Sequence, residues 1–247
     1  MKHKSLVFVS VLLISSAMAF AQGDRSKAVG RVEEAGNVIN EIMAAPDHGI
    51  PSNVIESAQC VAIVPSYLKA AFGFSGTYGR GVASCRTGAG WSAPAFFSLK
   101  GGGFGFQIGG QAIDLIMLVM NREGMQALLS SKFKLGGDVS VAAGPVGREA
   151  EATTDWKMRA EVLTYSRARG VFAGVALNGA LIRQDASTTR DFYGHMIPFK
   201  TLLTGNTPAP QDSQTFLGAL RKYAGEDGNT PAKAETPAAT KPPSGRH

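Results

Sequence analysis

Four basic side chains lie in a long stretch of the chain that carries no acidic residue. From Ser57 to Ile113 the sequence has no Asp or Glu, yet it includes Lys69, Arg80, Arg86 and Lys100 among many glycines. Such a segment creates a local positive potential that attracts phosphate, anionic lipid or nucleic acid. Arginine suits phosphate because its planar guanidinium can donate two hydrogen bonds to one group. Each cation alone is most simply a solvated surface residue, but their joint separation from acids predicts an anion-binding segment.

Two phenylalanines and three later arginines extend this candidate site. Phe104 and Phe106 are flanked by glycine, and they would enter an acyl layer or line an apolar pocket if the segment binds lipid. Ordinary sheet core is the simpler interpretation of these two rings. Arg148, Arg167 and Arg169 would add hydrogen-bond donors for phosphate.

The distribution of charge argues against nucleic acid as the partner. The formal net charge is +6, of which residues 1–21 carry +2 and residues 205–247 carry +1. Residues 22–204 therefore carry only +3. A body so nearly neutral does not bind nucleic acid through its bulk charge, so any anion binding depends on the local segment.

Motifs for catalysis, cofactors and metals are incomplete. Ser66-Tyr67-Leu68-Lys69 matches the Ser-x-x-Lys of penicillin-recognising serine enzymes, but no Ser-Asp-Asn or Lys-Thr-Gly completes it. Gly103-Phe104-Gly105 begins a dinucleotide fingerprint that lacks its third glycine. His48 and His195 lack partners at metal-ligand spacing. We therefore expect no enzyme activity, cofactor or metal, with a serine hydrolase at this motif or at Ser75 as the weakest alternative.

The first residues have the parts of a secretory signal peptide. Lys2 and Lys4 form a positive n-region, Leu6–Ile14 an apolar h-region, and Ala19-Phe20-Ala21 a cleavage site. We expect residues 1–21 to be removed. No later apolar run approaches the roughly 18–20 residues that a membrane span needs. The expected location is periplasmic or secreted, at most peripheral to a membrane.

Export makes a disulfide between Cys60 and Cys85 the favoured interpretation of the two cysteines. They lie in neighbouring strand-like segments, and their bond would contribute about 2–4 kcal/mol. Two buried free thiols are the alternative.

Hydrophobic periodicity predicts helices at both ends and in the middle of the chain, with short strands between them. Apolar residues recur at helical spacing from Val29 to Met43, and the acidic polar face of this helix suits a sheet cover better than a membrane surface. Other helices are expected at 51–55, after the N-cap Asn121, at 185–193 and at 212–223. The expected β-segments are 60–64, 71–74, 82–86, 95–99, 104–108, 115–120, 133–143, 156–164 and 171–181, with a hairpin at 87–90 and a bend at Gly136-Gly137.

These elements predict an α+β fold with a large antiparallel, glycine-bent β-sheet, open or barrel-like, flanked by amphipathic helices. The main domain is expected to cover residues 22–204, followed by a C-terminal helix at 205–224. Pro, Ala, Thr, Gly and Lys dominate 225–247, which predicts a disordered tail.

Several segments in succession resemble the SYLF domain, a lipid-binding module of bacterial exported proteins and of eukaryotic membrane-trafficking proteins. The resemblance covers about Val32 to Tyr193. Its motifs are Cys60–Pro65, Gly79–Val82, Trp91–Pro94, Gly105–Gly110 followed by Asp114, Leu135–Gly137, Ser140–Arg148, Tyr165-Ser166 and Gly170–Gly174.

This resemblance implies phospholipid binding without enzyme activity. Eukaryotic members often carry SH3 or FYVE domains, and some bind actin. The leading hypothesis is therefore a non-enzymatic phospholipid-binding protein of the bacterial cell envelope, whose partner is a phospholipid or a membrane surface. The alternative is a structural module of the envelope that binds another protein.

Overall fold

The computed structural model describes residues 24–45, 49–146, 160–168, 171–174 and 177–225, and of 70–75, 103–109 and 171–174 it describes the backbone alone. Its strands form one eight-stranded sheet in the order β2-β1-β3-β6-β5, with β7 beside β6, β8 beside β3 and β4 beside β8. The strands are β1 (Cys60–Thr87), β2 (Gly90–Trp91), β3 (Ala95–Val119), β4 (Lys132–Lys134), β5 (Val141–Ala143), β6 (Val162–Ala168), β7 (Val171–Gly174) and β8 (Leu181–Gln184).

The helices flank this sheet. An N-terminal helix covers residues 24–43. The others are α2 (Ser52–Ser57), α3 (Arg122–Leu129), α5 (Ala186–Tyr193), α6 (Phe199–Leu203), the 3-10 turn η2 (Gln211–Ser213) and α7 (Gln214–Ala224). The helices expected around 29–43, 51–55, 185–193 and 212–223, and the helix after Asn121, are confirmed.

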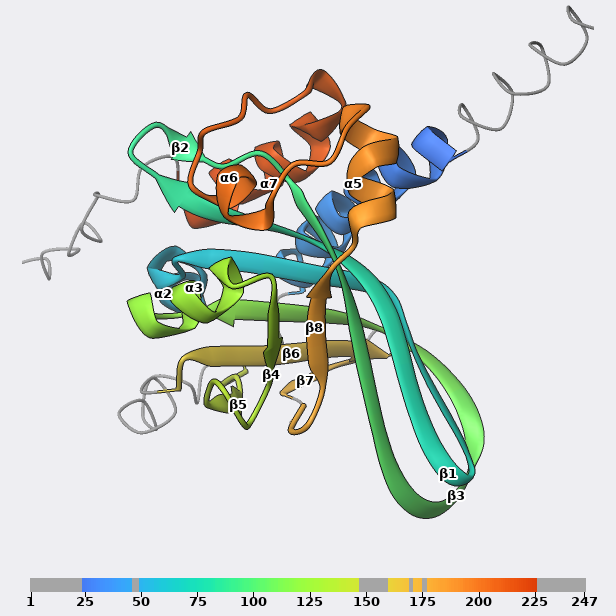
Figure 1. Cartoon of the computed structure of the whole chain (residues 1–247). Coiled ribbons are helices and arrows are strands. Elements are labelled where there is room, and N and C mark those ends of the chain that lie inside the picture. The colour runs from blue at the N-terminus through green and yellow to red at the C-terminus, as the bar shows by residue number, and fades with distance from the viewer. Residues whose placement is uncertain (1–23, 46–48, 147–159, 169–170, 175–176, 226–247) are drawn as a thin grey trace, which may run out of the picture.

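Two long strands, β1 and β3, organise the molecule. They pair antiparallel from Cys60 opposite Val119 to Ala83 opposite Ala95. This two-stranded ribbon bends back on itself halfway, and the bend extends away from the helices (Figure 1). The separate short β-segments expected between residues 60 and 120 are parts of these two strands, because the glycines bend the ribbon without ending its pairing.

The two halves of the ribbon pack face to face. The Tyr67 hydroxyl in the first half donates a 2.6 Å hydrogen bond to Thr77 Oγ1 in the second. A Cβ atom at Gly81 would lie 2.4 Å from the carbonyl oxygen of Ile63, so only glycine permits this approach. Because side chains alternate along a strand, those next to Gly81, such as Arg80, point outward.

The bend divides the sheet into two layers. In the first layer, residues 60–72 of β1 pair with 108–119 of β3, and β6, β5 and β7 follow. In the second layer, residues 74–83 pair with 95–104, and β8 and β4 follow. The layers form a curled half-barrel in which only β5 and β6 pair in parallel among the described strands. The predicted α+β fold with a large, mainly antiparallel sheet is confirmed.

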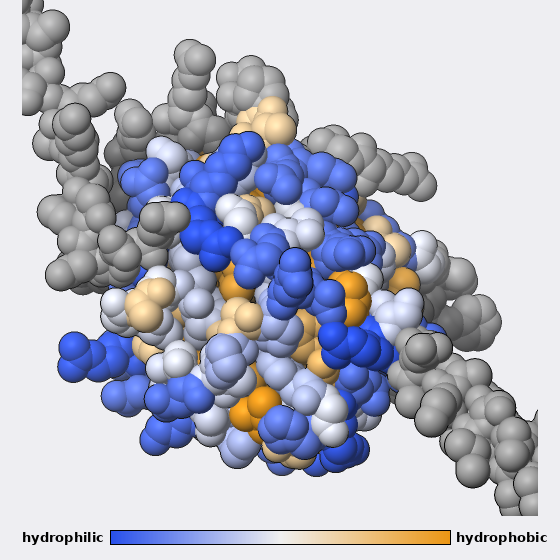
Figure 2. Space-filling view, turned by 90° about the horizontal axis from the view of Figure 1, so that it is seen from above, coloured by the Kyte–Doolittle hydropathy of each residue, from blue (hydrophilic) through white to orange (hydrophobic). Residues whose placement is uncertain are grey.

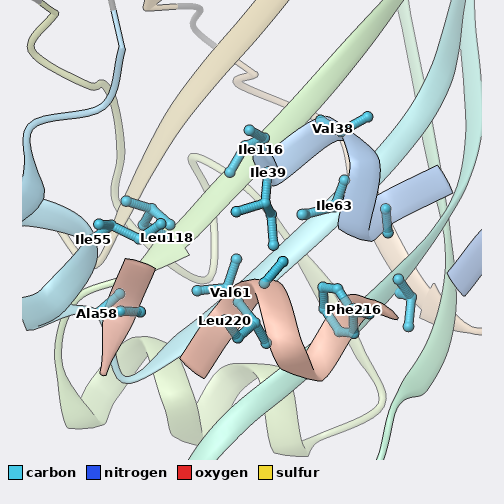
Figure 3. Packing of buried hydrophobic residues seen from close by; sticks show 14 of the residues in the cluster. Val38, Ile39, Ile55, Ala58, Val61, Ile63, Ile116, Leu118, Phe216 and Leu220 are labelled. Atoms are coloured by element: carbon cyan, nitrogen blue, oxygen red, sulfur yellow. The ribbon is translucent and has the colours of Figure 1, made fainter. Parts of the chain in front are cut away.

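Two hydrophobic cores hold the helices on the sheet. On the outer side of the first layer, the N-terminal helix, α2 and α7 pack against β1 and β3. Figure 3 shows Ile39, Phe216 and Leu220 from these helices close to Val61 and Ile63 of β1. The second core fills the space between the layers, where α3 and α6 contribute side chains.

The predicted disulfide is present between Cys60 and Cys85. Both cysteines are fully buried, and they lie near opposite ends of the same strand, β1. The bond therefore joins the two layers at the end of the ribbon that lies opposite its bend.

Local sequence signals place several connections as expected. The Asn121 side chain accepts a hydrogen bond from the Gly124 N–H and caps α3. Gly88 and Ala89 connect β1 to β2. Gly136 has a φ of 72° at the expected bend. Three predictions lie outside the described residues: the signal peptide at 1–21, residues 156–159 of the β-segment expected at 156–164, and nearly all of the tail.

The helical side of the molecule presents a mixed surface. Figure 2 shows this side from above, where hydrophobic residues form small separate areas among hydrophilic ones. Among the described residues, no helix combines the length and apolar character needed to cross a bilayer.

Candidate anion-binding face

The outer face of the second layer gathers five basic side chains from four strands. In β4 and β8, Phe133 and Ile182 are buried in the core between the layers. Because side chains alternate along a strand, their neighbours point to the opposite face, which is open to solvent. We call the resulting set the basic sheet face; it consists of Arg80, Lys100, Lys132, Lys134 and Arg183, all exposed.

The strand register arranges this face in two rows. Directly paired residues of antiparallel neighbours share a face, and adjacent strands lie about 4.8 Å apart. Row one runs across β1, β3, β8 and β4 as Arg80, Ser98, Arg183 and Lys132. Row two runs across the same strands, nearer the bend, as Tyr78, Lys100, Leu181 and Lys134.

Among the described residues, two carboxylates contact this face, and neither lies in the rows. Arg80 Nε lies 3.0 Å from Asp185 Oδ2, at the start of α5, and Arg80 also donates a 3.5 Å hydrogen bond to the Ser187 hydroxyl. Asp138 accepts a 2.7 Å hydrogen bond from the Lys134 backbone N–H. Five cations against two carboxylates leave the face with excess positive charge.

A sixth cation increases the positive charge beside Arg80. Arg31 of the N-terminal helix donates a 3.3 Å hydrogen bond to the Thr188 hydroxyl. Burial lowers the pKa of Arg31, and the like charge of Arg80 lowers it further, although the Asp185 carboxylate partly opposes both effects. The guanidinium groups of Arg31 and Arg80 thus both interact electrostatically with the buried Asp185 carboxylate.

The Asp185 carboxylate is held in its charged form. Burial alone would raise its pKa, but hydrogen bonds from Ser187 and Thr188 and the Arg80 charge outweigh burial and lower the pKa below its usual value. The same side chain accepts from the Thr188 N–H and caps α5. Arg80 is therefore fixed in place at the edge of the basic sheet face.

Arg86, predicted as a lipid ligand, lies away from this face and binds backbone carbonyls. Its guanidinium donates to the carbonyl oxygens of Ala58 and Glu56, each at 2.8 Å, and to that of Ala224. It also stacks on Trp91, 4.6 Å from the ring centroid. Burial lowers the pKa of Arg86. These contacts fasten the ends of α2 and α7 to β1.

Arg167 lies in the first layer, where its partners are acidic. Arg167 Nε and Nη2 donate to Asp114 Oδ2 at 2.9 and 2.5 Å, and Nη1 pairs with Glu41 of the N-terminal helix. The other Asp114 oxygen accepts a 3.0 Å hydrogen bond from the Ser66 N–H, where β1 is irregular. This network joins the N-terminal helix, β1, β3 and β6.

The remaining predicted residues are distributed as follows. Lys69 is half-buried in the first layer opposite Gln111, away from Lys100. The backbones of Phe104 and Phe106 belong to β3 at the ribbon bend, and their side chains lie outside what the structure describes. Arg148 and Arg169 lie outside the described residues. Of the predicted residues whose side chains the structure describes, it thus brings together Arg80 and Lys100.

Three residues of the face, Lys132, Lys134 and Arg183, were not expected from the sequence. The alternation of Phe133 with two lysines, and of Ile182 with Arg183, only weakly indicates strands that have one face exposed to solvent. Short strands of this kind reveal their shared face only through their pairing.

Catalytic arrangements gain no support from the described residues. Ser66 is exposed in an irregular part of β1 with a φ of 54°, and no hydrogen bond from its hydroxyl to a base is present in the described part. Among the described residues, no group of three His, Cys, Asp or Glu side chains could hold a metal.

Comparison with known proteins gives one family. Residues 100–223 match the Ysc84 family model, described as Las17-binding protein actin regulator. This segment runs from Lys100 of β3 into the last turn of α7, so it includes four of the five cations of the basic sheet face.

Similar curated proteins come from animals and yeast. The human SH3 domain-containing YSC84-like protein 1 is 36% identical over 180 residues, which are 72% of this chain and 52% of that protein. Protein YSC84 of Saccharomyces cerevisiae is 35% identical over 189 residues, 75% of this chain and 40% of that protein. LAS seventeen-binding protein 3, from the same yeast, is 36% identical over 189 residues, 75% of this chain and 41% of that protein. The chain thus spans about half or less of the length of these relatives.

Proposed function

Because the chain belongs to the Ysc84 family, which confirms its SYLF resemblance, we propose that it binds anionic phospholipids without catalysing a reaction. The observation that carries this proposal is the basic sheet face. Five exposed cations on one face of the sheet, with excess positive charge, form a surface complementary to phosphate groups. Positive side chains close to an anionic bilayer each contribute about 1 kcal/mol to binding.

We place this activity in the bacterial cell envelope. The sequence of residues 1–21 supports export, and a disulfide such as Cys60–Cys85 persists in oxidising compartments. Fractionation of cells with N-terminal sequencing tests this location. Recovery of a chain processed near residue 21 in the periplasm or medium is expected, whereas an unprocessed cytoplasmic protein would contradict it.

Vesicle binding by charge variants tests the proposed site. The variant Lys132→Gln/Lys134→Gln/Arg183→Gln removes three exposed cations without touching Arg80 or its partner. Losing three contributions of about 1 kcal/mol should weaken binding to phosphatidylglycerol vesicles roughly a hundredfold at low salt. Co-sedimentation over a range of lipid concentrations measures this change.

A matched variant controls for the loss of overall charge. Lys27→Gln/Arg190→Gln/Lys222→Gln removes three exposed cations from helices. It should bind these vesicles nearly as the unaltered protein does, and neither should bind phosphatidylcholine vesicles strongly. Equal affinity of the two triple variants would show that lipid does not bind at the basic sheet face.

A protein partner is the second candidate, because the matching family is described as Las17-binding and actin-regulating. An acidic protein surface would suit the same five cations. Pull-down from envelope extract with the unaltered protein and both triple variants separates the two functions. The second function would be favoured if the unaltered protein does not bind vesicles but captures a stoichiometric protein partner, and if only the variant of the basic sheet face loses that partner.

A further inference from the structure

Row two of the basic sheet face has the composition of a membrane-interface contact. Across four strands it alternates apolar and basic side chains: Tyr78, Lys100, Leu181 and Lys134. Tyr78 is 41% exposed, and Lys100 Nζ lies 5.5 Å from its ring centroid. Tyrosine and lysine both combine an apolar body with a polar tip, which suits the boundary between lipid headgroups and acyl chains. Row one, in contrast, is entirely polar or charged.

Among the ribbon residues whose side chains the structure describes, the other exposed large apolar residue is Leu68, which points the opposite way. Leu68 is 53% exposed in the first layer. Tyr67, the neighbour of Leu68, points inward and donates a hydrogen bond to Thr77 in the facing layer. Thr77 is in turn the neighbour of Tyr78. Because side chains alternate along a strand, Leu68 and Tyr78 lie on opposite outer faces of the folded ribbon. A flat bilayer that contacts the basic sheet face therefore meets Tyr78 and leaves Leu68 in water.

An end-on insertion of the ribbon would bring both residues into lipid, but it would carry an energetic cost. In the described pairings, residues 68–78 of β1 pair only with β3, and residues 101–113 of β3 pair only with β1. Among the described residues, neither outer edge of the bend has a partner strand for its backbone groups. Each such group costs several kcal/mol in the hydrocarbon region, so flat docking is favoured over deep insertion.

We propose that the protein docks flat on the surface of an anionic bilayer, with Tyr78 and Leu181 at the headgroup–acyl boundary and the cations of both rows on phosphates. This inference rests on the proposed function, because it takes anionic phospholipid as the ligand of the basic sheet face. It makes the partner an intact lipid surface and not a single lipid enclosed in the fold. Lys100 and Lys134 extend their apolar stems beside the two anchors.

Single tryptophans placed on the surface test this orientation. Tyr78→Trp reports on row two and Leu68→Trp on the opposite face. Met196→Trp is a matched control, because Met196 is also 41% exposed but lies between α5 and α6. Emission is recorded on phosphatidylglycerol vesicles with and without brominated acyl chains, and the unaltered protein supplies the background of its two native tryptophans.

Among positions 68, 78 and 196, the expected result is a blue shift and a loss of emission with brominated lipid at position 78 alone. Leu181→Trp probes the same row from β8 and should respond in the same way, so the test does not depend on one variant. Equal quenching at 68 and 78 would overturn flat docking in favour of end-on insertion. Vesicle binding without quenching at 78 or 181 would overturn the inference and leave the proposed function standing. Absence of vesicle binding by the unaltered protein would overturn both.

Discussion

Removal of the Cys60–Cys85 disulfide should destabilise the fold by an amount set by the length of the loop that it closes. The two cysteines are 25 residues apart in sequence. In the chain-entropy model, a loop of this length costs the unfolded state about 12 cal/mol/K, or about 3.5 kcal/mol at 25 °C. Both side chains are fully buried, so replacement by alanine leaves only the small volume of each sulfur unfilled. We therefore expect a loss of about 3.5 kcal/mol for Cys60→Ala/Cys85→Ala.

Urea unfolding of both single variants and the double variant measures this loss. Either single change breaks the bond, so each should cost nearly as much as the double change, and their effects should not add. The melting temperature should fall by roughly 7–14 °C. A reductant should lower the stability of the unaltered protein by a similar amount and leave the double variant unaffected. Additive single effects of about 1 kcal/mol, with no response to reductant, would refute the reasoning.

Three further predictions concern contacts that support the two layers. Arg86→Lys keeps the charge but loses the hydrogen bonds to three carbonyl oxygens, so it should lower the free energy of urea unfolding by about 2 kcal/mol and leave vesicle affinity unchanged. Reduced vesicle affinity at full stability would contradict this structural role. Gly81→Ala should lower the stability by about 1–3 kcal/mol, because its Cβ would meet the facing half of the ribbon. Gly76→Ala lies in open space and should change the stability by less than about 1 kcal/mol. Equal shifts in melting temperature would count against the face-to-face packing of the two halves. The pKa of Asp185 in the folded protein lies below its usual 3.8, so ionisation of this carboxyl stabilises the fold above that pH, and the contribution is lost as the pH falls further. The stability advantage of the unaltered protein over Asp185→Asn should therefore shrink below about pH 4. A constant advantage from pH 2 to 7 would disprove this role.

Local signals in the sequence were sufficient for most of the helices and several turns, but not for α6 (Phe199–Leu203), which no expected helix covers. The N-terminal helix follows from apolar residues at helical spacing, and Asn121 caps α3 through its own side chain. Each of these helices and turns depends on residues that lie close together in the chain, whereas the disulfide joins residues 25 apart and was predicted from the expected export. The extent of β1 and β3 was not evident, because a glycine such as Gly81 can either end a strand or let two strands approach closely. The close approach becomes evident only in the structure, where the Ile63 carbonyl oxygen of the facing half lies next to Gly81.

The candidate site was only partly predictable for a related reason. The stretch around Arg80, Arg86 and Lys100 lacks acids in sequence, but the fold brings acceptors to it from distant segments. Arg80 meets Asp185 of α5, and Arg86 meets carbonyls at the ends of two helices. The cations that complete the basic sheet face come from β4 and β8, which join it only through their register.

The most direct test of the central claim is to map where lipid contacts the folded protein. Backbone amide chemical shifts of the unaltered chain would be followed during titration with soluble short-chain phosphatidylglycerol, and with phosphatidylcholine as the neutral comparison. The predicted result is a set of perturbations confined to residues 78–80, 98–100, 132–134 and 181–183, seen with phosphatidylglycerol and weakened by salt. Perturbations confined to the inner core or to α7, or equal responses to both lipids, would contradict anionic lipid binding at the basic sheet face.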